Sequence, residues 1–182
     1  MGMAAPVYYT AEMVRALPDD GQRYEVVHGE LLVTPAPREL HQRVLVRLVQ
    51  ALTNYLDRQP VGALYASPAD ISWTPDTLVQ PDLFVAALDE ARSGEWSRFR
   101  TLLLTVEVLS PSSVRQDRFT KRRLYQEARV GTYWIVDADT KSVEIWTPDA
   151  LFPQVVTETL AWHPAGAAEP FTLALEVLFR PL

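Results

Sequence analysis

Four acidic residues stand out because of the segments around them. Glu107 interrupts the apolar run 102–109 (LLLTVEVL), where an unpaired carboxylate costs several kcal/mol. We therefore expect Glu107 to be paired or metal-bound, the alternative being a salt bridge at a sheet end. Asp82 (VQPDLFV) and Glu25 (RYEVVHGE) would, taken alone, be a turn residue and an exposed strand residue. Glu30 is expected on an exposed strand face.

The predicted helix 114–129 concentrates positive charge. Asp117, Lys121 and Tyr125 recur every four residues and therefore lie along one helix face. Two interpretations are open: a solvated face with an Asp117–Lys121 pair, or a basic element with one face directed at phosphates. The six basic residues of the segment, against two acidic ones, are Arg115, Arg118, Lys121, Arg122, Arg123 and Arg129.

Together these residues predict a metal site. Carboxylates from adjacent strands bind Mg²⁺ or Mn²⁺ through oxygen, and a nearby lysine can orient a water molecule. Phosphodiester hydrolysis needs both: a metal ion that neutralises developing charge and an oriented nucleophile.

The elements that must position these residues follow from periodicity and turn signals. Helices and strands alternate irregularly, which is typical of an α/β sheet with helices on its faces, here preceded by a helix and a β-hairpin. Residues 88–100 are polar and loop-like, with room for one helical turn, and the apolar stretch 171–179 is expected to pack back on the domain. Helices are predicted over 11–16, 38–58 and 114–129, and strands over 22–28, 30–34, 62–66, 69–73, 79–87, 102–109, 132–137, 142–147 and 154–160.

Composition narrows the class of protein. The chain has 182 residues, of which 48% are hydrophobic and 22% charged, as in a soluble globular fold of one domain, 1–182. It has no cysteine, which excludes disulfides, thiol catalysis and Cys-ligated metals. The absence of a long apolar segment or a secretory signal favours a cytoplasmic protein that does not enter a membrane. The net charge of −6 argues against a non-specific nucleic-acid coat.

Four stretches in order resemble one known family. They are RYEVVHGELLVTPAP, HQRVLVRL, VQPDLFV and TVEVLSPSSVRQDRFTKRRLYQEARVGTYWIVD. Over residues 10–179 the chain resembles the Uma-type restriction endonucleases of the PD-(D/E)XK nuclease superfamily. The resemblance implies a restriction-endonuclease-like mixed β-sheet flanked by helices, and a Mg²⁺- or Mn²⁺-dependent endonuclease that hydrolyses DNA.

The resemblance also implies roles for individual residues. Asp82 and Glu107 match the acidic metal ligands of the motif, and the carbonyl of Val108 would be a further ligand. Glu25 matches an acidic residue of the N-terminal hairpin, and Lys121 matches the family's helix lysine, with a role in orienting water and stabilising charge.

Two positions depart from the usual pattern. Most superfamily members carry the lysine two residues after the glutamate, which here is Leu109, so Lys121 must reach the site from the next helix. His28 stands where the family more often has Asp. His41 matches a family histidine, and its period predicts a structural residue, with phosphate contact or proton transfer as the alternative.

The substrate contacts are expected on the basic helix, where Arg115, Arg118 and Arg122 suit phosphate binding because the guanidinium fork matches phosphate oxygens. DNA is the expected partner, and a homodimer would let two sites cut two strands. A nuclease fold without catalytic activity, serving as a nucleic-acid-binding or assembly module, stays open. So does hydrolysis of another phosphodiester, such as RNA or branched DNA.

Overall fold

The computed structural model describes residues 7–181, and its centre is a six-stranded mixed sheet. Neighbouring strands pair antiparallel except β5 and β6, which are parallel. This confirms the predicted mixed sheet flanked by helices. In spatial order the strands are β3 (Gly62–Ala66), β4 (Leu83–Ala87), β5 (Leu102–Val108), β6 (Tyr133–Asp137), β7 (Ser142–Trp146) and β8 (Gln154–Val156).

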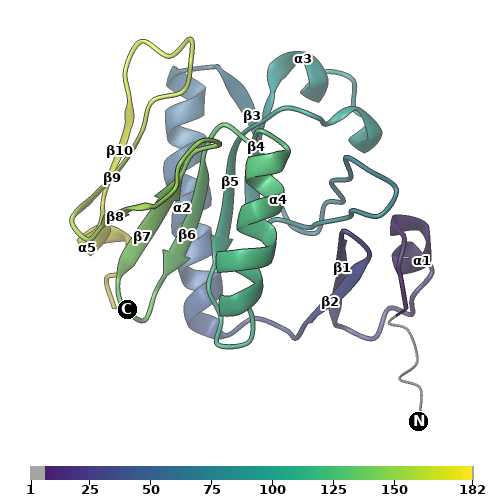
Figure 1. Ribbon diagram of the computed structural model, residues 1–182. Helices are drawn as coiled ribbons and strands as arrows, with labels where there is room; N and C mark the ends of the chain where they lie inside the picture. The colour runs from purple at the N-terminus through teal and green to yellow at the C-terminus, as the bar shows by residue number, and fades with distance from the viewer. Residues whose placement is uncertain (1–6, 182) are drawn as a thin grey trace.

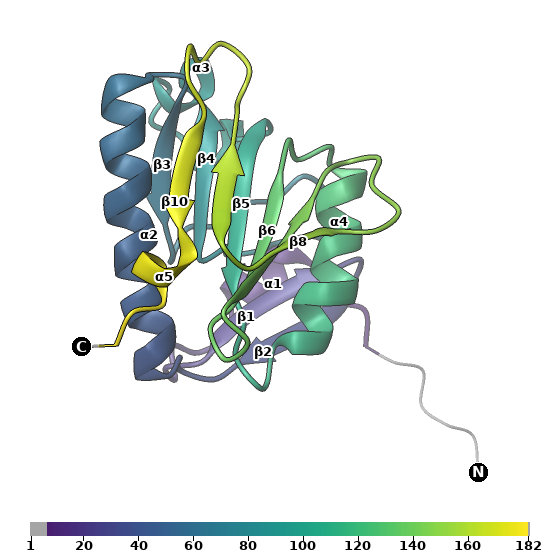
Figure 2. The ribbon, with the colours of Figure 1, turned by 90° about the vertical axis from the view of Figure 1, so that its left-hand side faces the viewer.

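Helices cover both faces of this sheet (Figures 1 and 2). The long helix α2 (Glu39–Arg58) lies on one face. On the other lies the crossover that the parallel pair β5–β6 requires, which consists of a π-helical segment, η2 (Gln116–Lys121), continued by α4 (Arg122–Glu127). No helix within residues 7–181 is long and apolar enough to span a membrane.

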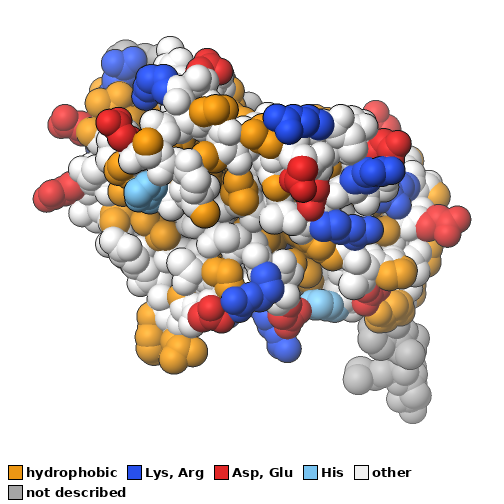
Figure 3. Space-filling view, turned by 90° about the horizontal axis from the view of Figure 1, so that it is seen from above, with side chains coloured by type: hydrophobic (Ala, Val, Ile, Leu, Met, Phe, Trp, Pro, Cys, Tyr) orange, Lys and Arg blue, Asp and Glu red, His pale blue; other side chains and the backbone are white. Residues whose placement is uncertain are grey.

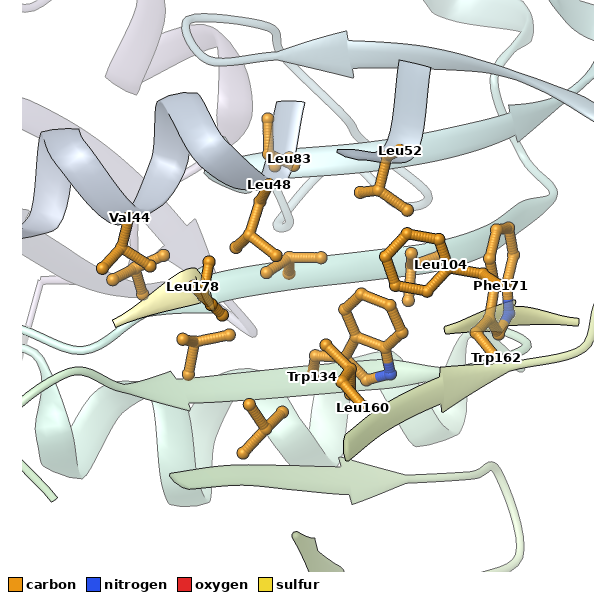
Figure 4. Packing of buried hydrophobic residues seen from close by; sticks show 14 of the residues in the cluster. Val44, Leu48, Leu52, Leu83, Leu104, Trp134, Leu160, Trp162, Phe171 and Leu178 are labelled. Atoms are coloured by element: carbon orange, nitrogen blue, oxygen red, sulfur yellow. The ribbon is translucent and has the colours of Figure 1, made fainter. Parts of the chain in front are cut away.

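The larger core lies between α2 and the sheet (Figure 4). Val44, Leu48 and Leu52 follow one another at helical spacing and are fully buried. They pack against central-strand residues such as Leu104 and Trp134. A separate two-stranded sheet packs against this core. It comprises β9 (Thr159–Trp162) and β10 (Phe171–Ala174), followed by the short helix α5 (Leu175–Leu178).

The N-terminal elements form a separate layer near one end of the central strands. Helix α1 (Ala11–Arg15) begins at Thr10, whose side chain accepts a hydrogen bond from Met13 N. Strands β1 (Arg23–Val27) and β2 (Glu30–Thr34) form a two-stranded sheet of their own. Both residues of their turn, His28 and Gly29, have positive φ, as a two-residue type I′ hairpin requires.

Several predicted boundaries were wrong for identifiable reasons. The predicted strand 69–73 contributes only a single bridge, Ile71–Val79, because 67–82 runs as a loop before β4. The predicted strand 154–160 is two strands, β8 and β9, that belong to different sheets. Residues 88–100 contain two short helices, α3 (Leu88–Ala91) and the 3₁₀ turn η1 (Trp96–Arg98).

The crossover helix ends at Glu127, and Arg129 takes the left-handed conformation that follows a helix end.

Gly131 is needed for close packing, because a Cβ there would lie 2.8 Å from the carbonyl oxygen of Leu103. We expect Gly131→Ala to lower the free energy of unfolding by ~1–3 kcal/mol, measured by urea denaturation. An unchanged unfolding midpoint would contradict this close contact.

Candidate active site

The predicted acidic residues meet at one end of the two central strands. Glu107 is the penultimate residue of β5, and Asp82 directly precedes β4. Because Leu83 pairs with Val106 in the antiparallel register, Asp82 comes opposite Glu107 when the pairing is continued by one residue. Glu25 reaches this end from β1. All three carboxylates are almost completely buried.

Lys121 lies at the centre of a buried cluster of acids. Its Nζ is 2.7 Å from Glu25 Oε2, 3.0 Å from Glu107 Oε1 and 3.7 Å from Asp117 Oδ1. The hydroxyl of Tyr125 donates to the same Glu107 oxygen at 3.0 Å. Lys121 is only 1% exposed, so the solvated Asp117–Lys121 pair that the spacing left open is excluded.

The π-helical segment explains how one helix presents three inward residues at spacings of four. In an α-helix, residues four apart drift steadily around the axis. A π turn contains an additional residue and bonds i to i+5, so it rotates less per residue and reverses this drift. Asp117 and Lys121 in η2 and Tyr125 in α4 are consequently all buried on the sheet side.

Asp82 is held by a different set of donors. Arg23 Nη1 lies 2.8 Å from Oδ1, while His41 Nε2 at 3.0 Å and the backbone N–H of Val108 at 2.8 Å approach Oδ2. Burial alone would raise the pKa of Asp82, but the hydrogen bond from His41 and the positive charge of Arg23 outweigh it and lower the pKa to about 2. Asp82 is therefore ionised at neutral pH.

Arg23 is the residue that sequence reasoning missed. Its Nε lies 3.8 Å from Glu25 Oε2, so it connects Asp82 to the Lys121 cluster. The available signal was its position two residues before Glu25, which places both side chains on the same face of β1.

The buried cluster contains more acidic than basic groups. Four carboxylates (Glu25, Asp82, Glu107, Asp117) face two cations, Arg23 and Lys121. Burial raises the pKa of Glu107 to about 8, with Asp82 and Asp117 adding to the rise and Lys121 opposing it. Burial likewise raises the pKa of Asp117. The cluster therefore holds protons that a cation of higher charge could replace.

His41 is a buried partner of Asp82 on the first turn of α2. Its Nδ1 is also buried and has no hydrogen-bond partner among the described residues. The contact with Asp82 agrees with a structural role for His41, and a role in phosphate contact or proton transfer stays a prediction.

The predicted phosphate-binding arginines are largely engaged within the protein. Arg118 Nε pairs with Glu144 at 2.7 Å and its Nη2 with Asp137 at 3.4 Å. Arg122 lies over the ring of Trp146, 4.8 Å from its centroid. Arg115 alone of the three predicted arginines is exposed. On the face that Figure 3 shows, Lys and Arg side chains alternate with Asp and Glu and form no continuous basic patch.

A cavity of about 390 Å³ leads to one part of this cluster. Asp82, Val108, His41 and Arg23 line it, whereas Glu25, Glu107 and Lys121 do not. Of the four acids of the cluster, Asp82 is therefore the one that lines the cavity.

The donor set fits a hard divalent cation in charge and chemistry. Carboxylate and carbonyl oxygens are its preferred ligands, and the cluster has an excess of two negative charges when all four acids are ionised. Among residues 7–181, no three His, Cys, Asp or Glu residues are arranged to hold a metal ion. Arg23 and Lys121 occupy carboxylate oxygens that a cation would use.

Comparison with known proteins identifies a matching family and a solved structure of similar fold. The family model described as "Uma2: Putative restriction endonuclease" matches residues 11–176. A crystal structure titled as a putative nuclease belonging to DUF820 from Anabaena variabilis has a TM-score of 0.75 to this chain at 22% identity, covering 94% of this chain and 97% of that one. At this identity the likeness establishes the fold. No curated protein sequence matches the chain.

Proposed function

Since the chain belongs to the Uma2 family of putative restriction endonucleases, we propose that it is a Mg²⁺- or Mn²⁺-dependent endonuclease that hydrolyses phosphodiester bonds of DNA. The observation that carries this proposal is the buried acidic cluster next to an open cavity. Burying an excess of carboxylates destabilises a fold, and such groups occur where charge or proton chemistry requires them.

Asp82 and Glu107 are the carboxylates that would hold the ion, with the carbonyl of Val108 as a third ligand. A bound divalent ion would neutralise charge on the phosphate and increase the acidity of water. For this, Arg23 must release Asp82 Oδ1, which makes its guanidinium available to a phosphate oxygen on the cavity side.

Lys121 and Glu25 hold these ligands in place rather than binding the ion. The three carboxylates around Lys121 raise its pKa, although burial opposes this, so it stays cationic and cannot serve as a base. Its ammonium fixes Glu107 and contributes positive potential at the site of attack. Glu25 fixes Lys121 in turn, and its Oε1 accepts a hydrogen bond from Gln80 N at 2.7 Å.

A second candidate is a nuclease fold that binds nucleic acid or a protein without cutting. It is favoured because the cluster is shielded from solvent: Glu107 and Lys121 are each 1% exposed and contact each other. The homodimer expected from the need to cut two strands stays a prediction.

Asp82→Asn separates the two candidates. The substitution keeps the size of the side chain but removes the charge that would bind the ion. We expect DNA cleavage in Mn²⁺ to fall by at least ~10²–10³-fold, and Mn²⁺ binding by calorimetry to be lost.

The matched control is Asp57→Asn, at an exposed position of α2, which should leave both properties unchanged. If wild type takes up no Mn²⁺ and cuts no DNA, the non-catalytic candidate is correct. Cleavage by Asp82→Asn at the wild-type rate would assign the activity to another site.

A further inference from the structure

The cavity beside Asp82 has a volume of about 390 Å³, which admits a small part of a nucleic acid but not a duplex, whose major groove alone is ~12 Å wide and ~8.5 Å deep. Asp82 and Val108 lie inside this cavity and are only 3% and 2% exposed. A phosphodiester that reaches them must therefore bring an individual nucleotide with it rather than a paired segment.

The walls of the cavity suit a nucleobase. The segment after β2 contributes Pro35 and Pro37, and the segment after β3 contributes Pro68. Proline rings are rigid and apolar, and bases extruded from a helix are held between apolar or aromatic side chains. Gln42 from α2 lines the same space, and its side chain is exposed. An amide can pair with the edge of an unstacked base.

Polar residues of the cavity suit the attached phosphate. Arg23 is the one arginine in the lining, which also includes the hydroxyl residues Ser110 and Ser113. Arg23 Nη1 bonds Asp82, so a phosphate-binding group lies next to the proposed metal ligand, in the same cavity as the proline rings.

The charged residues outside the cavity also favour an individual nucleotide over a paired segment. Duplex binding draws most of its affinity from several backbone phosphates held by free cations. In the crossover segment most of these cations already have an acidic or aromatic neighbour: besides Arg118 and Arg122, Arg123 pairs with Glu127 and Arg129 with Asp149 at the surface, which leaves Arg115 as the exposed exception. Binding must then depend more on stacking of bases, as in proteins that hold single strands.

We infer that the cavity is a nucleotide subsite and that the substrate is unpaired DNA: a single strand, or the unpaired part of a bubble or flap. This inference rests on the proposed function for cleavage, but it predicts binding independently of cleavage.

The test uses fluorescein-labelled oligonucleotides of one sequence in three forms: single-stranded, fully paired, and paired with a central bubble. Anisotropy in EDTA measures binding at ~50 and 200 mM salt, and gels with Mn²⁺ measure cleavage. We expect the single strand and the bubble to bind at least tenfold more tightly than the duplex, with weak salt dependence, and to be the forms that are cut.

A variant that fills the cavity tests the location. Ala36 is exposed and lines the cavity between the two prolines, so Ala36→Trp should reduce single-strand binding at least tenfold without changing thermal stability. The matched control is Ala161→Trp, at an exposed position of β9, which should bind as wild type does. If Ala36→Trp does not fold, Gln42→Trp narrows the same cavity from α2.

The outcomes are distinct. Equal binding or cutting of the duplex, or wild-type binding by the filled variants, overturns the inference while leaving nuclease activity intact. Preferential single-strand binding that is lost in Ala36→Trp, without cleavage of any DNA, supports the subsite and removes the proposed endonuclease function.

Discussion

Lys121→Met is expected to lower the free energy of unfolding by ~3–5 kcal/mol, the usual cost of removing one member of a buried ion pair. Methionine fills a similar volume but leaves Glu25, Glu107 and Asp117 without the ammonium that lies 2.7 to 3.7 Å from their oxygens. Urea denaturation in metal-free buffer measures the loss. Cleavage, where it can be assayed on the folded fraction, should fall as well.

The chain offers a matched control because it has only one other lysine, Lys141. Lys141 is exposed at the turn between β6 and β7, so Lys141→Met should change stability by less than ~0.5 kcal/mol. The double variant Lys121→Met/Glu107→Gln should recover part of the lost stability, since it removes one of the acids left without a cation. Equal stability of the Lys121→Met and Lys141→Met proteins would refute the buried cluster.

Glu107→Gln is expected to stabilise the metal-free protein, and increasingly so at higher pH. Because the folded-state pKa of Glu107 is raised from 4.5 to about 8, the unfolded chain ionises this group between those values while the folded chain keeps the proton. The unfolded state then binds fewer protons, so stability falls as pH rises, by ~1.36 kcal/mol per pH unit. Glutamine cannot ionise, and its oxygen can still accept from Lys121 and Tyr125.

Wild type and Glu107→Gln should therefore have similar unfolding midpoints near pH 5. By pH 8 the variant should be more stable by a few kcal/mol in EDTA. Glu176→Gln, at an exposed position of α5, controls for the loss of a surface charge and should follow the wild-type pH dependence. A Glu107→Gln protein less stable than wild type at pH 8 would mean that Glu107 is ionised and supports the fold.

The parts of the site that could be predicted are those that a pattern within one short segment of the sequence indicates. A carboxylate within an apolar strand needs a partner, and this alone identified Glu107 as special. Helical spacing placed Asp117, Lys121 and Tyr125 on one face. The hairpin and α2 were likewise predicted, because alternation, turn residues and a long helical period are local signals.

The parts that could not be predicted depend on distant partners. Arg118 was assigned to phosphate because its acidic partners, Glu144 and Asp137, lie 26 and 19 residues farther along the chain. Arg23 and His41 converge on Asp82 from β1 and α2. The spacing of Arg23 and Glu25 places those two on one strand face, but nothing within β1 or α2 indicates the shared contact with Asp82. The cavity arises from five separate stretches of chain, so no local pattern predicts its size or its walls.

The wide turn at residues 116–121 also links chain length to the site. Removing one residue from this turn would restore an ordinary α-helix, at ~100° per residue, because the additional residue is what widens the turn. The parts of the helix before and after the deletion would keep nearly the same orientation, so an acid three residues before Lys121 would still face the sheet. In related chains, a single-residue gap here should therefore accompany an acid three rather than four residues before the lysine, so that this helix tolerates a change of length without losing the buried cluster.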